Sequence, residues 1–188
     1  MPGAVQAPAG TPIPKLTRPG QAFFDLFKAI QAESGCLVPP RKSLTLPVSK
    51  PFAAYLSILE LREPQVAIVR IIGTANVNRT RVDNTGKNWF EMFPAETRAD
   101  IWRAFRLILD TPRGSLVFAH EDYQRSIGIE VLTFPFADDN GVPTYIVSTT
   151  TQLELRELAL RGDETMLSSS LPDSEYFIDI GAGQGPPV

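Results

Sequence analysis

Cysteine and histidine, the side chains that most often do covalent or metal chemistry, occur once each in this chain, as Cys36 and His120. A single cysteine excludes an internal disulfide and any site with several thiolate ligands. A single histidine leaves no second imidazole for a metal site or for a nucleophile that needs its own base. We therefore expect no bound metal, and we expect His120 to be an ordinary strand residue whose ring is solvated or hydrogen-bonded.

Paired carboxylates are the next candidates for acid–base chemistry, and they occur as Glu121-Asp122 and Asp138-Asp139. A carboxyl group that works near neutral pH must be buried or paired so that its pKa is shifted. The first pair lies at a predicted strand end and the second lies in a predicted turn, where water solvates both. The spaced glycines 181, 183 and 185 resemble a dinucleotide loop, but no strand–helix unit contains them. We expect neither enzymatic turnover nor a bound cofactor.

The overall charge and hydropathy exclude further classes of protein. The 188 residues carry a net charge of −3 and give a pI near 5.2, whereas a nucleic-acid binder needs a basic face. No apolar run approaches the length of about 18 residues that a membrane helix requires. The N-terminus is rich in proline and alanine and does not resemble a secretory signal. We expect a cytoplasmic protein without nucleic-acid or membrane partners.

The periodicity of apolar residues predicts the elements that would position any site. Apolar residues at helical spacing predict one helix near the N-terminus and another in the middle of the chain, with short helices before the second. The Asn-Gly pair at 140–141 predicts a hairpin between the last two strands. Helices are predicted over 21–34, 74–81, 89–93, 95–110 and 153–161, and strands over 56–61, 65–72, 115–123, 129–136 and 144–152. This order predicts an α+β fold with a five-stranded antiparallel sheet and helices on one face.

Three short motifs in these elements resemble the PAS superfamily, in particular its proteobacterial branch of single PAS domains. They are Arg70-x-x-Gly73-Thr74, a turn at Gly86-Lys87-Asn88, and a Phe-Pro-Phe strand at 134–136 followed by Asp-Asn-Gly. The resemblance covers about residues 36–152. It implies a PAS-like sheet with strands in the spatial order 2-1-5-4-3 and an N-terminal flanking helix. It also implies a non-catalytic sensor or regulatory module that acts through contacts with an unknown signalling protein.

The inner face of such a sheet is a candidate pocket for a small apolar ligand, because many aromatic side chains surround few polar groups. The alternative is a core that these side chains fill completely. The short helix after Gly86-Lys87-Asn88 has no cysteine, so the covalent flavin chemistry of PAS photoreceptors is not expected. The candidate pocket residues are Val69, Ile71, Trp89, Phe90, Phe93, Trp102, Phe105, Leu109, Val131 and Thr133.

The outer face of the sheet also needs a cover, because the strand over 65–72 is apolar on both faces. The first helix carries a stripe of Phe23, Phe27 and Ile30, with Phe24 beside it. We predict that these four residues help to form a homodimer. The alternative is that the helix packs on its own sheet and the chain stays monomeric.

The ends of the chain differ in composition from the middle. Residues 1–18 are rich in proline and are predicted to be mobile, 19–162 form the single PAS-like domain, and 163–188 form a mobile tail. Tyr176, Phe177, Ile178 and Ile180 interrupt the polarity of that tail, so it docks on a partner or on the domain itself, or its apolar residues are incidental. A second interpretation of the chain is an enzyme or ligand carrier on a cone-shaped fold of the ketosteroid-isomerase kind.

Overall fold

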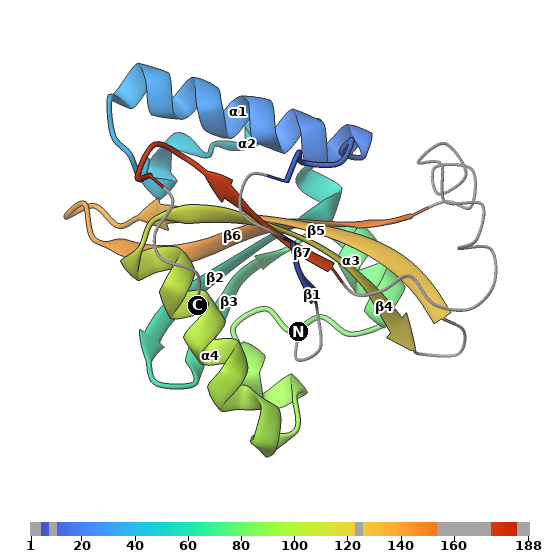
Figure 1. Ribbon diagram of the computed structural model, residues 1–188. Helices are drawn as coiled ribbons and strands as arrows, with labels where there is room; N and C mark the ends of the chain where they lie inside the picture. The colour runs from blue at the N-terminus through green and yellow to red at the C-terminus, as the bar shows by residue number, and fades with distance from the viewer. Residues whose placement is uncertain (1–4, 8–10, 123–125, 154–173, 184–188) are drawn as a thin grey trace.

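The computed structural model describes residues 5–7, 11–122, 126–153 and 174–183, and places one curved sheet between two layers of helices (Figure 1). The helices are α1 (Arg18–Ser34), α2 (Leu46–Ser49), α3 (Thr74–Thr80) and α4 (Ala95–Asp110), with single turns η1 (Arg41–Ser43), η2 (Ala53–Tyr55) and η3 (Trp89–Met92). The strands are β1 (Val5–Gln6), β2 (Leu56–Glu63), β3 (Val66–Ile72), β4 (Arg113–Asp122), β5 (Ser126–Ala137), β6 (Pro143–Gln152) and β7 (Ser174–Asp179).

The strand order across the sheet is β1-β7-β4-β5-β6-β2-β3. The five central strands therefore follow the predicted order 2-1-5-4-3, and every pair among them is antiparallel. The helices α3 and α4 connect β3 to β4, so the crossover lies where the PAS arrangement has it. The fold is α+β and PAS-like, as the sequence predicts.

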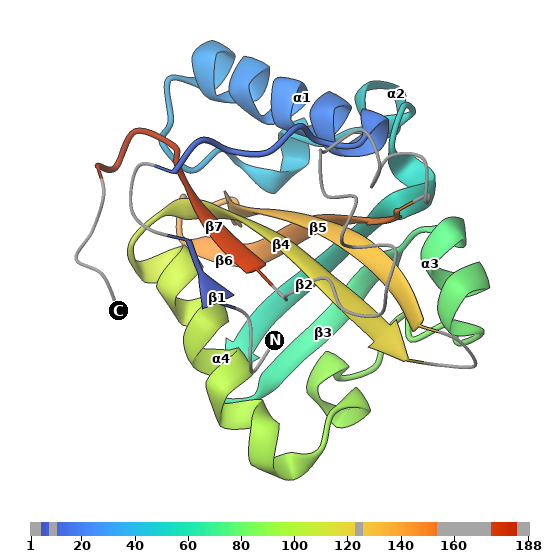
Figure 2. The same ribbon diagram turned by 45° about the vertical axis from the view of Figure 1, so that its right-hand side comes forward.

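Two hydrophobic layers hold the sheet, and the figures show a helix on each side of it (Figure 2). On one face, α1 packs over β5 and β6 with a core that includes Phe23, Phe27, Phe134 and Phe136. On the other face lie α3, η3 and α4, with a separate aromatic core. The predicted arrangement with short helices on one face and a flanking helix on the other is confirmed.

The boundaries of α1 follow from local chemistry. Thr17 is the N-cap, and its hydroxyl accepts a hydrogen bond from the Gly20 N–H. Pro19 lies in the first turn, where proline costs no hydrogen bond, so the helix starts three residues before the predicted Gln21. Gly35 ends the helix with φ of 65° and donates its N–H to the Gln31 carbonyl oxygen at 2.9 Å.

The prediction that both ends of the chain are mobile is wrong for several described residues. Ser174–Asp179 form β7, which pairs antiparallel with β4, and Val5–Gln6 pair in parallel with β7. Thr17 is 2% exposed. Of the alternatives for the C-terminal apolar segment, docking on the domain itself is the one that the structure contains. The predicted helix over 153–161 lies, apart from Leu153, outside the described residues.

Candidate functional site

An aromatic cluster fills the space between the sheet and α4, where the sequence leaves open either a pocket or a filled core. The ring centroids of Trp89 and Phe93 lie 4.4 Å apart, and those of Trp89 and Phe105 lie 5.1 Å apart. Phe90 contacts both Trp102 and Phe105, at 5.9 and 6.0 Å. These spacings are those of aromatic side chains in direct contact.

The elements around the cluster come from three parts of the chain. Val69 of β3 and Leu109 of α4 close it, and both are almost completely buried. Phe90 is fully buried, while the other four rings are half-buried. The helix therefore presents a partly open aromatic surface rather than a sealed core. Seven of the predicted pocket residues are brought together here: Val69, Trp89, Phe90, Phe93, Trp102, Phe105 and Leu109.

Val131 and Thr133 approach the same layer from β5, because Leu132 and Phe134, which alternate with them, face α1. The Thr133 hydroxyl lies 2.9 Å from the Ser148 hydroxyl on the neighbouring strand. This pair of hydroxyls supplies polar groups to the face of the sheet that α4 covers.

Ile71 does not belong to the cluster, and its placement in the pocket is wrong. Ile58 pairs with Ile71 but Leu59 pairs with Val69, so β3 carries one extra residue, Arg70, at this point. An extra residue shifts the alternation of the strand by one position and moves the next side chain to the opposite face. Ile71 consequently shares a face with Ile58 and is 40% exposed.

The Arg70 side chain pairs with the carboxylate of Glu60 on the neighbouring strand. The Glu60 side chain accepts hydrogen bonds from the Nε atoms of Arg70 and Arg62. Partial burial raises the pKa of the Glu60 carboxyl, but the two guanidinium groups outweigh it and hold that pKa below its ordinary value. The first motif residue thus fastens β3 to β2 on the face that α1 occupies.

Gly73 and Gly86 have backbone roles. A Cβ atom on Gly73 would lie 2.3 Å from the Ala54 carbonyl oxygen, so only glycine lets β3 pass η2 this closely. Gly73 is also the N-cap of α3, and Thr74 is the first helical residue. Gly86 adopts φ of 81° and donates its N–H to the Val69 carbonyl oxygen at 2.8 Å.

The amide side chain of Asn88 ties the turn after Gly86 to β3 and to the start of η3. Its Oδ1 accepts the N–H of Ala67 at 3.0 Å and that of Phe90 at 3.3 Å. Its Nδ2 donates to the Gln65 carbonyl oxygen at 3.2 Å. The turn therefore covers the outer edge of β3 and positions η3, which carries Trp89 and Phe90.

The stripe on α1 is intramolecular core, so its assignment to a dimer interface is wrong. Phe23 and Phe27 are 0% exposed and Ile30 is 5% exposed within one chain. Phe27 stacks on Phe134 with a centroid distance of 4.1 Å. Phe24 is half-buried and also lies against Phe134, at 5.9 Å. The alternative, in which the helix packs on its own sheet, describes the structure.

A buried carboxylate, which the sequence alone does not indicate, lies beneath α1. Glu130 is 1% exposed, and its oxygens accept the Thr17 N–H at 2.8 Å and the Thr17 hydroxyl at 2.5 Å. A Cβ on Gly20 would lie 2.3 Å from Glu130 Oε1, so a larger residue there would displace the carboxylate from its present position. A glutamate in a strand that is otherwise apolar on that face was the one available signal.

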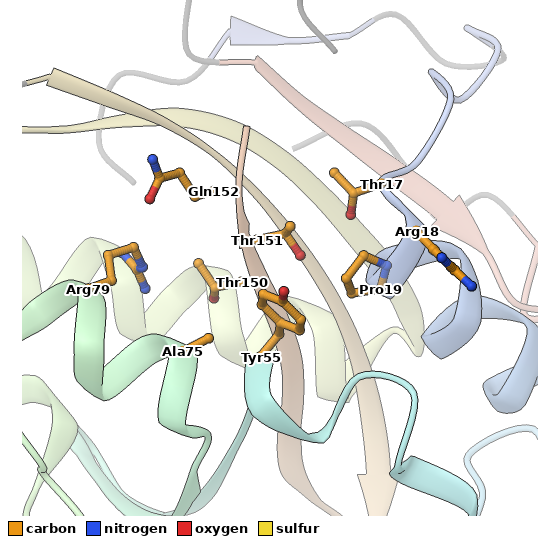
Figure 3. Close-up of a pocket in the computed structure, with 9 residues that line it drawn as sticks. All are labelled: Thr17, Arg18, Pro19, Tyr55, Ala75, Arg79, Thr150, Thr151 and Gln152. Carbon is orange, nitrogen blue, oxygen red and sulfur yellow. The ribbon is translucent and has the colours of Figure 1, made fainter. Parts of the chain in front are cut away.

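A hollow of about 430 Å³ opens where the start of α1, η2, α3 and the end of β6 meet (Figure 3). Arginine side chains and hydroxyl groups line most of it. The Thr151 hydroxyl has no hydrogen-bond partner among the described atoms, but it is shielded from the hollow because its exposed area is below 1 Å². The lining residues are Thr17, Arg18, Pro19, Tyr55, Ala75, Arg79, Thr150, Thr151 and Gln152.

The acidic residues that the sequence singled out have structural surroundings where they are described. Asp138 Oδ1 accepts the N–H groups of Asn140 and Val142, each at 2.9 Å, and so fixes the hairpin turn. Within the described ranges, no group of three histidine, cysteine or acidic residues could hold a metal ion. Over the same ranges, no helix has both the length and the apolar character needed to span a bilayer.

No protein-family model and no curated protein matches this chain. Among solved structures, the VqmA dimer of Vibrio cholerae is similar at 18% identity with a TM-score of 0.44, over 59% of this chain and 52% of that one. A LOV protein of Rhodobacter sphaeroides is 12% identical with a TM-score of 0.44, over 74% of this chain and 71% of the other.

The dark structure of the aureochrome1 LOV photoreceptor is also similar, at 12% identity with a TM-score of 0.44, over 64% of this chain and 90% of the other. This chain spans only about half the length of VqmA. The PAS-like assignment rests on the strand order and on the helical crossover between β3 and β4.

Proposed function

We propose that this protein is a non-catalytic PAS-type regulatory module, of the proteobacterial single-domain branch, that acts by contacting another protein. The observation that carries the proposal is the aromatic cluster held between a PAS-like sheet and α4, with four of its five rings half-buried. The surroundings of the cluster suit recognition of an apolar group rather than proton transfer, because its contacts are between rings and aliphatic side chains.

The surroundings of the described acids agree with a non-catalytic role. Glu60 is held by two arginines, Glu130 by the start of α1, and Asp138 by the backbone of its turn. The enzyme alternative, on a cone-shaped fold, needs long helices before the sheet that pack into its concave face. Here a single long helix, α1, comes before the five central strands, and α3 and α4, which carry the other layer, come between β3 and β4.

Gating by a small apolar ligand is the finer part of the proposal, and tryptophan emission tests it directly. Both tryptophans of the chain, Trp89 and Trp102, lie in the aromatic cluster. Titration with the apolar dye 1-anilinonaphthalene-8-sulfonate should quench tryptophan emission by energy transfer at one dye per chain. Mass spectra of the purified protein, native against denatured, should show any ligand that remains bound.

A matched pair of variants separates the cluster from the opposite face. Phe105→Ala removes a half-buried ring from the cluster and should strengthen dye binding at least threefold. Phe24→Ala removes a half-buried ring next to Phe134 on the α1 face and should leave dye binding unchanged. Equal effects of the two changes, or no transfer from the tryptophans, would contradict ligand binding at the cluster.

A homodimer remains part of the proposal, with its interface away from the α1 stripe. The exposed apolar side chains near α2 are its best candidates, since Leu46 is 79% and Val48 is 42% exposed. Light scattering of the wild type and of the Leu46→Ser/Val48→Ser variant tests this. A dimer that the double change leaves intact would place the interface elsewhere, and a monomeric wild type would remove the homodimer from the proposal.

A further inference from the structure

The edge of the PAS-like sheet at β4 is occupied by a segment from near the end of the chain. Six residues of β7 pair antiparallel with β4, from Arg113 opposite Asp179 to Phe118 opposite Ser174. In Figure 2, β7 lies beside β4 and extends the sheet past its five central strands. Without this segment, β4 would present its unpaired N–H and C=O groups to any extended peptide.

The seat of β7, which is formed by β4 and the core beneath α1, accommodates apolar side chains at alternating positions. Tyr176, Ile178 and Ile180 belong to or pack against the core beneath α1, and both isoleucines are 3% exposed. A Cβ on Gly114 would lie 2.5 Å from Phe134 Cε1 and 3.0 Å from Ile178 Cβ. Glycine at this position of β4 therefore allows a docked side chain to reach the sheet.

Three further contacts fix the register of the docked strand. The Ser115 hydroxyl donates to Glu175 Oε1 at 2.9 Å, and the Gln31 side chain donates to the Ile180 carbonyl oxygen at 3.1 Å. The Arg113 guanidinium lies 5.0 Å from the centre of the Phe177 ring. The seat thus recognises an acidic residue and an aromatic residue on the side opposite to the buried isoleucines.

The hold on β7 is nevertheless limited. Its outer neighbour β1 is only two residues long, and Ser174 through Phe177 are half-buried. Within β7 only Ile178 is almost completely buried, and Ile180 directly follows the strand. Edge elements with few buried side chains are those that open before the rest of a domain does.

We infer that the β4 edge is a docking site for an extended segment of a partner protein, and that β7 is the occupant that the chain itself supplies. The partner segment has branched or aromatic apolar residues at alternate positions and an acidic residue where β7 has Glu175. It adds to the sheet as a strand after displacing β7. The inference rests on the proposed function in one respect, since it supplies the contact through which a regulatory module would act.

A fluorescent peptide with the sequence of residues 172–182 is the probe, used with the full chain. Ile178→Ser weakens β7 but leaves β4 and α1 unchanged, so this variant should bind the peptide at least tenfold more tightly than the wild type. Asp179→Ser is the matched control at an exposed neighbouring position and should bind like the wild type. A peptide that itself carries Ile178→Ser should not bind. Equal affinity of the Ile178→Ser variant and the wild type would overturn the inference.

A disulfide lock tests the same site with β7 held in place. Val117 and Glu175 are opposite each other in the ladder, so Val117→Cys/Glu175→Cys in a Cys36→Ser background should form an intrachain disulfide and abolish peptide binding. Peptide binding that survives the lock would overturn the inference. Covalent dimers in place of the intrachain bond would show that a second copy fills the seat, and would also overturn it.

If the Ile178→Ser variant does not fold, hydrogen exchange of the wild type tests whether β7 opens before the rest of the sheet. The amides of Tyr176 and Ile178 should exchange at least tenfold faster than those of Leu132 and Phe134 in β5. Equal protection would mean that β7 opens only when the whole sheet does. Such a failure concerns the strand site alone, because failure of the proposed function would appear in the dye titration at the aromatic cluster.

Discussion

The two faces of the sheet are built from similar side chains but packed to different degrees. On the α1 face, Phe23, Phe27, Phe134 and Phe136 are all 0% exposed. Of the five aromatic rings that gather on the α4 face, Phe90 alone reaches that value. The aromatic rings of the α1 face are therefore more completely buried, and those of the α4 face leave more of their surface exposed to solvent.

The largest expected difference between the two faces is in the free energy of unfolding. Phe27→Ala removes a fully buried ring that stacks on Phe134 and should cost about 3–5 kcal/mol. Phe105→Ala removes a half-buried ring and should cost about 1–2 kcal/mol, since less area returns to water. Urea unfolding followed by circular dichroism measures both. A larger loss for Phe105→Ala would contradict the expectation that the more completely buried rings contribute more to stability.

The second expected effect concerns the backbone of β3 at its end. Gly73→Ala places a Cβ 2.3 Å from one backbone carbonyl oxygen and 2.5 Å from another, and backbone atoms cannot rotate away. The change should destabilise the domain by about 2–3 kcal/mol. Gly35→Ala is a control of a different kind, because it meets open space and suffers only from its φ of 65°. It should cost about 1 kcal/mol, and a similar loss for both would contradict the steric argument.

The third expected effect tests how α1 is fastened to the sheet. Glu130→Ala leaves the Thr17 N–H buried without its acceptor, and should cost about 1–3 kcal/mol. Thr17→Ala removes the hydroxyl that both Glu130 and the Gly20 N–H use. If the two act through their mutual contact, a double-mutant cycle should give a coupling of about 1 kcal/mol. Additive losses would show that the buried glutamate stabilises α1 by another route.

The order of strands and helices could be predicted from the sequence because it follows from local patterns. The Asn-Gly hairpin forms as expected, with Gly141 at φ of 81°. The aromatic cluster was predicted too, because Trp89 and Phe105 lie on elements whose apolar faces are readable from spacing. These features depend on residues close to each other along the chain.

The features that could not be predicted depend on contacts between distant residues. Thr17 and Glu130 are 113 positions apart, and neither residue alone indicates a helix cap supplied by a strand. The bulge at Arg70 moves Ile71 to the other face. A prediction that assumes strict alternation along the strand therefore places Ile71 on the wrong face. The docked strand β7 lies in a segment flanked by glycine and proline, whose four apolar residues, Tyr176, Phe177, Ile178 and Ile180, are too few to indicate pairing with β4.

The smallest expected effect is electrostatic and belongs to the α1 face, between β2 and β3. The pKa of the Glu60 carboxyl is lowered in the folded state by Arg70 and Arg62, against the opposing effect of partial burial. A lowered pKa means that the folded state binds this proton less readily than the unfolded state does. The stabilising contribution is therefore present at neutral pH and is lost as the pH falls below about 4. It should be below about 1 kcal/mol, because the Arg70 side chain is 41% exposed and water screens the pair. Urea unfolding between pH 7 and pH 3 should show a smaller loss of stability for Arg70→Gln than for the wild type. Arg103→Gln, which breaks a more exposed pair with Asp100 on the outer side of α4, is the control. Identical pH profiles for Arg70→Gln and the wild type would mean that the pair serves only to fix the bulge.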